Sequence, residues 1–325
     1  MSQTSILETA GEVVAVDSPP GWVTRLLDEA SAGALSPRPA SATMAIHIEA
    51  TSRPFSVAGL TPLTRGAWSH ADEVVVEDAC GSGFDVRLNL SSGCPEFTYR
   101  WRPRPTRSVA RFLLPSRFHL LAREVLMHYP VLWWASVRGR APLHAVACTT
   151  GDAVTLLAGP GGVGKSTLLQ LELAHGGRAT SDNLCVADGQ SVWGLVEPMR
   201  VAGTHGRRMP HGRVEVQFAG RVAQLSPDHL VIVRRSNGEA RVLTTCDPET
   251  AVRSLVTGTY AAGELGRFWS FAATLAAGTG IGPSHPLVAE TARAFAVRLN
   301  CYELHLPRRP GARLTEMLNR VEAIA

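Results

Sequence analysis

The stretch LLAGPGGVGKSTLLQ, residues 156–170, places closely spaced glycines directly before a lysine and two hydroxyl residues. Residues Gly159 to Ser166 match the pattern G-x-x-x-x-G-K-[ST] at every required position. Glycines let successive backbone N–H groups turn toward an anion, and they remove side chains that would block its approach. Lysine adds positive charge for the terminal phosphates, and the hydroxyl completes the shell of a Mg²⁺ ion. We therefore expect this P-loop motif to bind ATP with Mg²⁺.

Lys165 is the only lysine in the chain. Lysine and arginine together number 32, so every other basic side chain is a guanidinium. Arginine at almost every basic position, with abundant Ala, Gly and Val, is typical of coding bias. A position that remains lysine under such bias indicates a need for a compact point charge, which a planar guanidinium does not replace. The predicted cofactor-binding residues are Gly159, Pro160, Gly161, Gly162, Val163, Gly164, Lys165, Ser166 and Thr167.

The acidic partner of this motif is not where most P-loop ATPases carry it, at the end of an apolar strand. The obvious strand, HLVIVRR, ends in Arg234 and Arg235. The nearest acid is Asp182, in RATSDNLCVAD (178–188). We expect this segment to be a strand that returns parallel to the P-loop strand and beside it, which would bring Asp182 close to the γ-phosphate. An aspartate that caps a turn at a strand end is the alternative. The absence of LSGGQ-like and NKxD-type segments argues against an ABC transporter ATPase and a GTPase.

Further candidates lie on both sides of the motif. The loop GTHGRRMPHGR (203–213) contains His205, Arg207, Arg208, His211 and Arg213. Arg207 and Arg208 are predicted catalytic residues, because arginines here would neutralise the γ-phosphate or hold an anionic acceptor. Solvated surface charges are an equally good interpretation of this pair. His144 begins an apolar strand, where a histidine is as often structural as catalytic.

Residues 143–188 resemble the catalytic core of the bacterial HPr kinase/phosphorylase group and its shorter relatives. The resemblance rests on His144, the P-loop, the turn HGGR and the pair Asp182-Asn183, in the same order and at similar spacing. It implies that Asp182 is the base that takes the proton of the attacking hydroxyl, and that His144 lies near the phosphates. Asn183 falls where the family commonly has a second Asp near the metal, so the implied metal ligands are Ser166, Asp182 and Asn183. Glu197 would correspond to a later acidic position.

The resemblance also implies a P-loop kinase domain of HPr-kinase type, with Lys165, Asp182, His144, Arg207 and Arg208 as its catalytic residues. The family's downstream signature stretch has no clear counterpart, so HPr itself is not the expected acceptor. We expect an ATP- and Mg²⁺-dependent kinase that phosphorylates an alcohol hydroxyl of a small biosynthetic metabolite. The alternatives are a kinase of a seryl residue in a peptide or protein, and a P-loop regulatory ATPase without an acceptor.

The elements that would position these residues form an α/β arrangement. Residues 1–105 indicate a separate, mostly β module, with short apolar runs such as TMAIHIEA and FDVRLNL and one helix within 21–35. The proline-rich WRPRPTR at 101–107 marks the predicted boundary. Residues 106–325 form the predicted P-loop kinase domain, with strands around the motif and a C-terminal part that is helical by period.

Composition limits the remaining function classes. The chain has 325 residues, 45% of them hydrophobic and 18% charged, which is typical of a globular protein. A net charge of +4 with scattered arginines does not predict nucleic-acid binding. The N-terminus indicates no signal peptide, and no stretch is apolar enough to span a bilayer. The six cysteines show no metal-binding spacing. We expect a cytoplasmic protein that binds no membrane or nucleic acid, with a homo-oligomer as a candidate assembly.

Overall fold

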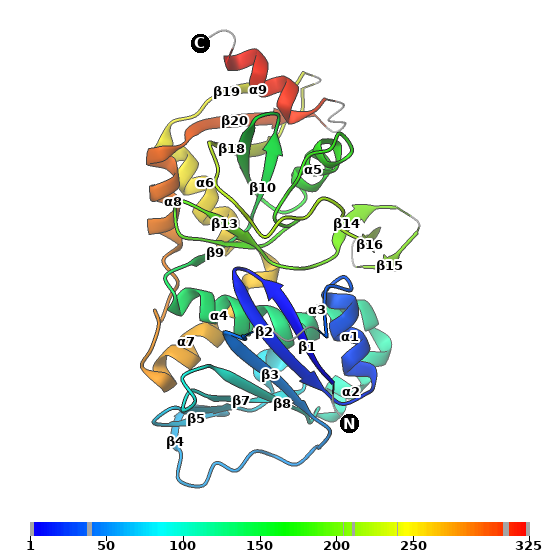
Figure 1. Cartoon of the computed structure of the whole chain (residues 1–325), viewed down its shortest axis with the longest axis vertical. Helices are drawn as coiled ribbons and strands as arrows, with labels where there is room; N and C mark the ends of the chain where they lie inside the picture. The colour runs from blue at the N-terminus through cyan, green and yellow to red at the C-terminus, as the bar shows by residue number, and fades with distance from the viewer. Residues whose placement is uncertain are drawn as a thin grey trace. The chain divides into compact units, whose positions relative to one another are not determined.

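The computed structural model describes residues 3–37, 41–203, 205–209, 212–238, 240–307 and 312–322. The chain divides into two compact units. The first contains Met1–Arg138, Arg208–Gly212 and Arg267–His285, and the second contains Gly139–Arg207, Arg213–Gly266 and Pro286–Ala325. Each unit combines sheets with helices, so the α/β class is confirmed (Figure 1).

The first unit is built on an eight-stranded sheet with the order β1-β2-β3-β8-β7-β6-β5-β4. The pairs β2–β3 and β3–β8 are parallel and the other pairs are antiparallel. The strands alternate buried and partly exposed residues, as β2 and β3 show, so one face of the sheet is covered. Their bounds are β1 Gln3–Thr9, β2 Glu12–Ser18, β3 Met44–Glu49, β4 Thr61–Thr64, β5 Ala67–His70, β6 Glu73–Val76, β7 Phe84–Asn89 and β8 Glu96–Trp101.

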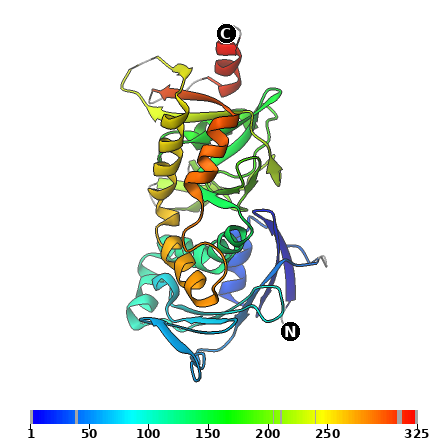
Figure 2. The same cartoon turned by 90° about the vertical axis from the view of Figure 1, so that its left-hand side faces the viewer.

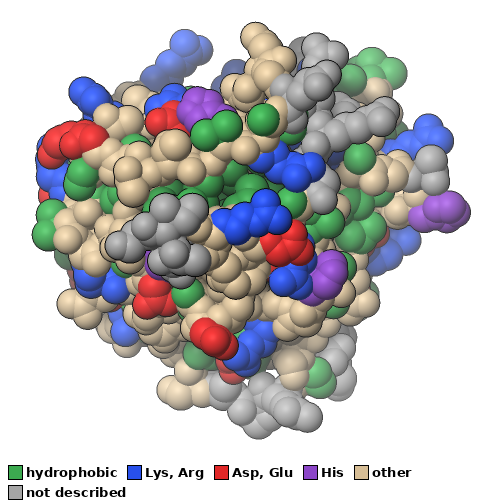
Figure 3. All heavy atoms as spheres, turned by 90° about the horizontal axis from the view of Figure 1, so that it is seen from above, with side chains coloured by type: hydrophobic (Ala, Val, Ile, Leu, Met, Phe, Trp, Pro, Cys, Tyr) green, Lys and Arg blue, Asp and Glu red, His purple; other side chains and the backbone are tan. Residues whose placement is uncertain are grey.

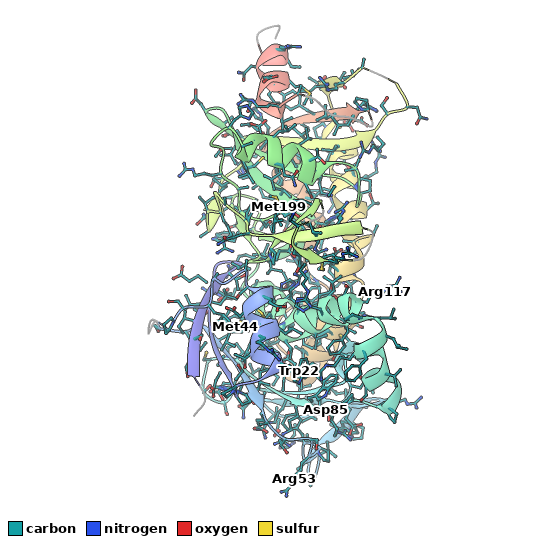
Figure 4. All side chains as sticks on the ribbon, turned by 90° about the vertical axis from the view of Figure 1, so that its right-hand side faces the viewer. Trp22, Met44, Arg53, Asp85, Arg117 and Met199 are labelled. Atoms are coloured by element: carbon teal, nitrogen blue, oxygen red, sulfur yellow. The ribbon has the colours of Figure 1, made fainter. Side chains whose placement is uncertain are left out.

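Helices cover this sheet and bring aromatic residues against it. Trp22 of α1 packs against Phe84, Trp101 and Phe118, with ring centroids 5.2 to 6.0 Å apart. Figure 4 labels Trp22 and the fully buried Met44 in this unit, and the exposed Arg53 between β3 and β4. The helices are α1 Trp22–Ala30, α2 Pro105–Leu113, α3 Pro115–Arg123, the π-helical turn η2 Glu124–His128, α4 Tyr129–Val137 and α7 Phe268–Thr279, with a 3₁₀ turn η1 at Ala79–Gly81.

The chain leaves this unit at Arg138, later than the boundary predicted at residue 105. The reason is packing of the helices after residue 105 on the sheet. Tyr99 of β8 donates a hydrogen bond to the carbonyl of Val125 (2.7 Å), and the rings of Phe97 and Trp133 lie 5.8 Å apart. The apolar run before residue 138 therefore completes the core of the first unit.

The second unit contains a five-stranded sheet with the order β10-β11-β18-β20-β19. Its central strands β11, β18 and β20 are parallel, and β10 and β19 are antiparallel edge strands. β18 is almost entirely buried up to Val233, as expected for a central parallel strand. The bounds are β10 Ala145–Thr150, β11 Ala153–Ala158, β18 His229–Arg235, β19 Val242–Thr245 and β20 Asn300–Leu306.

Two smaller sheets complete the strands of this unit, except that Arg208 at the end of β15 belongs to the first unit. One has the order β17-β13-β12-β9 and the other has the order β14-β16-β15. Met199, labelled in Figure 4, begins β14 and is buried in the core between the large sheet and its helices. The bounds are β9 Ala141–Leu143, β12 Cys185–Ala187, β13 Val192–Gly194, β14 Met199–Ala202, β15 Arg207–Arg208, β16 Arg213–Val216 and β17 Gln224–Leu225.

Four helices and a 3₁₀ turn flank these sheets. The helices α6 and α8 contact each other and run side by side in both cartoon views (Figures 1 and 2). Helix α9 packs on α5 through Leu314, Met317 and Leu318, which belong to the same buried cluster as Leu168 and Leu169. The bounds are α5 Lys165–Leu173, α6 Pro248–Tyr260, η4 Gly263–Leu265, α8 Val288–Arg298 and α9 Leu314–Glu322.

The predicted strand over 178–188 is the main error in the expected fold. Only Cys185–Ala187 forms a strand, and it lies in the sheet with β13 and β9. Residues 178–180 run antiparallel beside β10, since Thr149 N donates to Arg178 O and Thr180 N donates to Ala147 O. β10 therefore separates this segment from β11, and the segment does not lie beside the strand that leads into the glycines. The backbone bends at residues 181–183 instead of continuing as a strand.

Surface features agree with the composition. On the face shown in Figure 3, Lys and Arg side chains lie singly among apolar, polar and acidic ones. All six cysteines lie in the described part and are free thiols. Among the described residues, no helix has the length and apolar character needed to cross a membrane.

Candidate functional site

A cavity of about 330 Å³ in the second unit collects most of the predicted site residues. Its walls come from the glycine-rich loop (residues 159–164), the first residues of α5 and the bend at 182–183. Strands β14 and β16, the end of β18, and the connection from α6 into η4 complete the walls. The predicted residues that line it are His144, Gly161, Gly162, Gly164, Lys165, Ser166, Thr167, Asp182 and Asn183.

The glycine-rich loop has a backbone that requires glycine at its two ends. Gly159 has a φ of 141° and Gly164 a φ of 118°, values that other residues rarely adopt. A Cβ at residue 159 would lie 2.5 Å from the carbonyl oxygen of Val233 in β18, so the loop leaves β11 in close contact with the next strand. Gly164 is the N-cap of α5, and the helix therefore begins at Lys165. Unpaired N–H groups at the start of a helix favour an anion.

Lys165 points its ammonium back into this loop. Its Nζ donates to the carbonyls of Gly159 (2.7 Å) and Pro160 (3.2 Å), and lies 3.4 Å from His144 Nε2. The side chain is only 5% exposed. Burial lowers the pKa of the Lys165 ammonium to about 8, although Asp182 and Glu264 favour its charged form. The remaining predicted loop residues do not line the cavity: Gly159 is buried, Pro160 is exposed, and Val163 packs in the core.

Asp182 presents a carboxylate to the same cavity. Its Oδ2 accepts a hydrogen bond from the backbone N–H of Arg200 (2.9 Å), and the Ser166 hydroxyl also donates to the carboxylate. Its Oδ1 is buried and has no partner among the described residues. Burial raises the pKa of the Asp182 carboxyl above its usual range, against the opposing effect of these hydrogen bonds and of the arginines. A carboxylate with a raised pKa is better suited to accept a proton near neutral pH.

His144 and Asn183 lie next to the lysine. Nδ1 of His144 is 3.2 Å from the carbonyl of Gly258, and its Nε2 is 3.0 Å from Oδ1 of Asn183. Burial and the charge of Lys165 lower the pKa of the His144 imidazole to about 4. The ring is therefore neutral at pH 7 and has one proton, which Nδ1 donates to the carbonyl oxygen because that oxygen only accepts. Nε2 is then an acceptor that faces Lys165, and a hydrogen bond from Asn183 requires its amide to be turned so that Nδ2 replaces Oδ1 beside the ring.

The comparisons with known proteins add no relative. No family model matches the chain. A search of the curated proteins finds no significant match either. The site is therefore interpreted from its own geometry.

The donor set fits a single hard cation held jointly with phosphates. Ser166 offers a hydroxyl, Asp182 a carboxylate with an unpartnered oxygen, and Asn183 an amide. Mg²⁺ is commonly held by one or two protein oxygens together with substrate phosphates and water. The described residues contain no group of three or more His, Cys, Asp or Glu side chains that would hold a metal by themselves.

Sequence reasoning missed an ion-pair network behind Asp182. Arg200 donates to Glu264 (Nη1 to Oε1, 2.5 Å) and to Glu197 (Nη2 to Oε2, 3.1 Å), while its backbone N–H holds Asp182. Burial opposes ionisation of Glu264, but the charge of Arg200 and its hydrogen bonds lower the pKa of Glu264 to about 2. Only the spacing of Glu197 and Arg200 in EPMR was a local signal. Glu264 comes from η4 and meets Arg200 through the tertiary fold.

The loop arginines are placed differently from the prediction. Arg207 and Arg208 do not line the cavity, because they form β15, which β16 separates from β14. Arg213 of β16 does line it, and its charge acts on both Lys165 and Asp182. His205 is exposed and does not line the cavity, and His211 lies outside the described residues.

Proposed function

We propose that this protein is an ATP- and Mg²⁺-dependent kinase of HPr-kinase type that phosphorylates the hydroxyl of a small biosynthetic metabolite. The observation that supports this most is the meeting of Lys165, Ser166 and Asp182 in one cavity at the start of α5. Lysine and hydroxyl suit a phosphate chain with its metal, and a buried carboxylate suits an attacking alcohol. The order and spacing of the residues from His144 to Asn183 add the resemblance to the HPr kinase group.

In this mechanism Asp182 takes the proton of the acceptor hydroxyl as its oxygen attacks the γ-phosphorus. The bond between the γ-phosphorus and the bridging oxygen to the β-phosphate breaks, and ADP leaves with that electron pair. The N–H groups of the glycine-rich loop and the Lys165 ammonium neutralise the oxygens of the transferred group. Arg200 keeps Asp182 oriented through its backbone N–H. Ser166, Asp182 and Asn183 would hold Mg²⁺, which would neutralise charge on the phosphate chain.

Two features favour a small acceptor. Cavities for small molecules usually have roughly 300 to 1,000 Å³, and this one, at about 330 Å³, is at the lower end. Its lining includes the small residues Ala202, Ala261, Ala262 and Gly263, which take little of the space from a ligand. Arg213, which also lines the cavity, suits an acceptor that has an anionic group.

The test is phosphoryl transfer from γ-labelled ATP. The purified protein and its Asp182→Asn variant are incubated with Mg²⁺, labelled ATP and a soluble extract of the source cells. The products are then separated into small molecules and macromolecules. We expect label in a small molecule with the wild-type protein and none with the variant.

The other outcomes separate the alternatives. Label on a peptide or protein, absent with the variant, would replace the metabolite by a seryl acceptor. Free phosphate at equal rates from both proteins would indicate a regulatory ATPase and contradict the kinase.

A further inference from the structure

We propose that Arg235 is a second phosphate-binding cation, which contacts the polyphosphate chain of the nucleotide beside Lys165. The inference rests on the proposed function, because it concerns the same nucleotide. Arg235 ends β18, the parallel neighbour of the strand that leads into the glycine-rich loop. The carboxyl ends of parallel strands meet at one edge of the sheet, so the fold places this residue at the loop.

The guanidinium of Arg235 is held at the rim of the cavity by two backbone carbonyls. Nη1 donates to the carbonyl of Pro307 (3.0 Å) and Nη2 to that of Gly162 (3.4 Å). A Cβ at Gly164 would be 3.8 Å from Nη2, so the guanidinium lies against the N-cap of α5. A guanidinium has five N–H donors, and the two carbonyls use two of them. The others remain for a ligand of the loop.

The charges around Arg235 are unbalanced. Among the described residues it has no carboxylate within ion-pair distance, whereas its neighbour Arg234 pairs with Glu303. The guanidinium adjoins the positive end of α5, and the Lys165 ammonium lies at the other end of the same loop. Like charges gathered in this way are stabilised by an anion between them, and arginine matches phosphate oxygens in pairs.

An independent feature of the cavity also points to a ligand. Asp182, 4% exposed, lines the cavity and leaves Oδ1 without a partner among the described residues. A metal-bound polyphosphate would satisfy both sides, with its metal toward Asp182 and its free oxygens toward Lys165 and Arg235. Most P-loop ATPases place an acid at the end of the adjacent strand. Here that position is an arginine, so the strand end contributes to phosphate binding and not to metal binding.

The test compares Arg235→Gln with Arg234→Gln. Glutamine still donates to a carbonyl, so the first variant removes mainly the charge. The second removes a charge of equal size from the other face of β18, because neighbouring residues in a strand point to opposite faces. Dissociation constants are measured calorimetrically for MgATP and for magnesium tripolyphosphate, which has no nucleoside. We expect Arg235→Gln to weaken binding of both probes about tenfold or more and Arg234→Gln to leave both within twofold.

Three results would overturn the inference. If Arg235→Gln binds both probes as tightly as Arg234→Gln does, Arg235 has only a structural role at the loop. A loss for MgATP but not for tripolyphosphate would show that the guanidinium contacts the nucleoside. If the wild-type protein binds neither probe, the proposed function itself is wrong. The first two results would contradict only the role of Arg235. If Arg235→Gln lowers the melting temperature, Arg235→Lys, which keeps the charge, must recover at least part of the affinity for both probes.

Discussion

Buried charge defines the site at the scale of single residues. Lys165, Asp182 and His144 are each less than 6% exposed, so desolvation acts on all three. It lowers the pKa of the lysine and the histidine and raises that of the aspartate, and all three shifts disfavour the charged form. A bound polyphosphate and metal would supply the missing countercharges. This need for countercharge is the reason that the proposed function assigns MgATP to the site.

Asp182→Asn is expected to separate chemistry from binding. Asparagine keeps the acceptor for the Arg200 N–H and for Ser166 but cannot take a proton. We expect nucleotide affinity to stay within a few-fold and the transfer rate to fall by about 10² to 10⁴. Because the folded protein raises the pKa of this carboxyl, its charged form costs stability at neutral pH. The melting temperature of the variant is therefore expected to be unchanged or higher. A transfer rate near that of the wild-type protein would exclude Asp182 as the base.

The affinity for MgATP is expected to fall with rising pH. Lys165 has a pKa of about 8 in the free protein, so its ammonium is mostly charged at pH 7 and mostly neutral at pH 9. Phosphate binding requires the charged form and raises its pKa, so binding takes up a proton above pH 8. We expect the dissociation constant for MgATP to rise about tenfold from pH 7 to pH 9. Calorimetry in buffers of different ionisation enthalpy counts the protons, and a flat profile without proton uptake would contradict the assignment.

Among the elements, α5 connects the site to the C-terminal helix. Glu172, 4% exposed, lies one residue before the end of α5 and accepts from the N–H (3.1 Å) and the hydroxyl (2.6 Å) of Thr315. The first N–H groups of a helix have no partner within that helix. Glu172 supplies one from α5 to the N–H of Thr315 in the first turn of α9. The helix that begins at the glycine-rich loop is in this way fixed at its other end.

Removal of this contact should destabilise the second unit. We expect Glu172→Ala to lower the free energy of unfolding by about 1 to 3 kcal/mol, because the Thr315 donors are left buried without a partner. Glu316→Ala in the same helix is the control, since Glu316 is half exposed and makes one surface ion pair with Arg313. Urea titrations followed by circular dichroism measure both. Equal effects of the two substitutions would show that the buried contact adds nothing.

The sequence predicted the elements with strong local signals. The motif over Gly159 to Ser166, the strand over His229–Arg235 and the helices of the C-terminal part were all evident from sequence pattern. The path of the segment after α5 was not evident from the sequence. The chain bends at Asp182, and the cavity that this residue lines is formed by elements distant in the sequence. Arg200, Glu264 and Arg235 reach the site from three separate elements. No spacing in the sequence relates Arg200 or Glu264 to Lys165, so only the tertiary fold could reveal them. Arg235 was visible as the last residue of a strand, but its contact with the glycine-rich loop was not.

At the scale of the whole molecule, the chain passes between the two units several times. Arg267–His285, which contains α7, belongs to the first unit although the second unit flanks it in sequence. Phe268 and Phe271 of α7 pack on Tyr129, with ring centroids 5.7 and 5.8 Å away, and both are buried. A Cβ on Gly278 would lie 2.6 Å from Val74 Cγ2, so α7 also approaches the first sheet closely. The two units therefore cannot be separated by a single cut.

This interleaving predicts how fragments behave. A fragment of residues 139–325 would keep α7 but lose Tyr129, Val74 and the sheet that cover its apolar face. Exposed apolar surface of this kind drives association, so we expect the fragment to elute as oligomers or to precipitate. The matched control replaces residues 267–285 by a glycine–serine linker of equal length and should remain monomeric, with affinity for MgATP if the second unit folds alone. Size-exclusion chromatography with light scattering measures the oligomeric state of both fragments. A monomeric unmodified fragment would contradict the prediction, because the second unit would then cover α7 by itself.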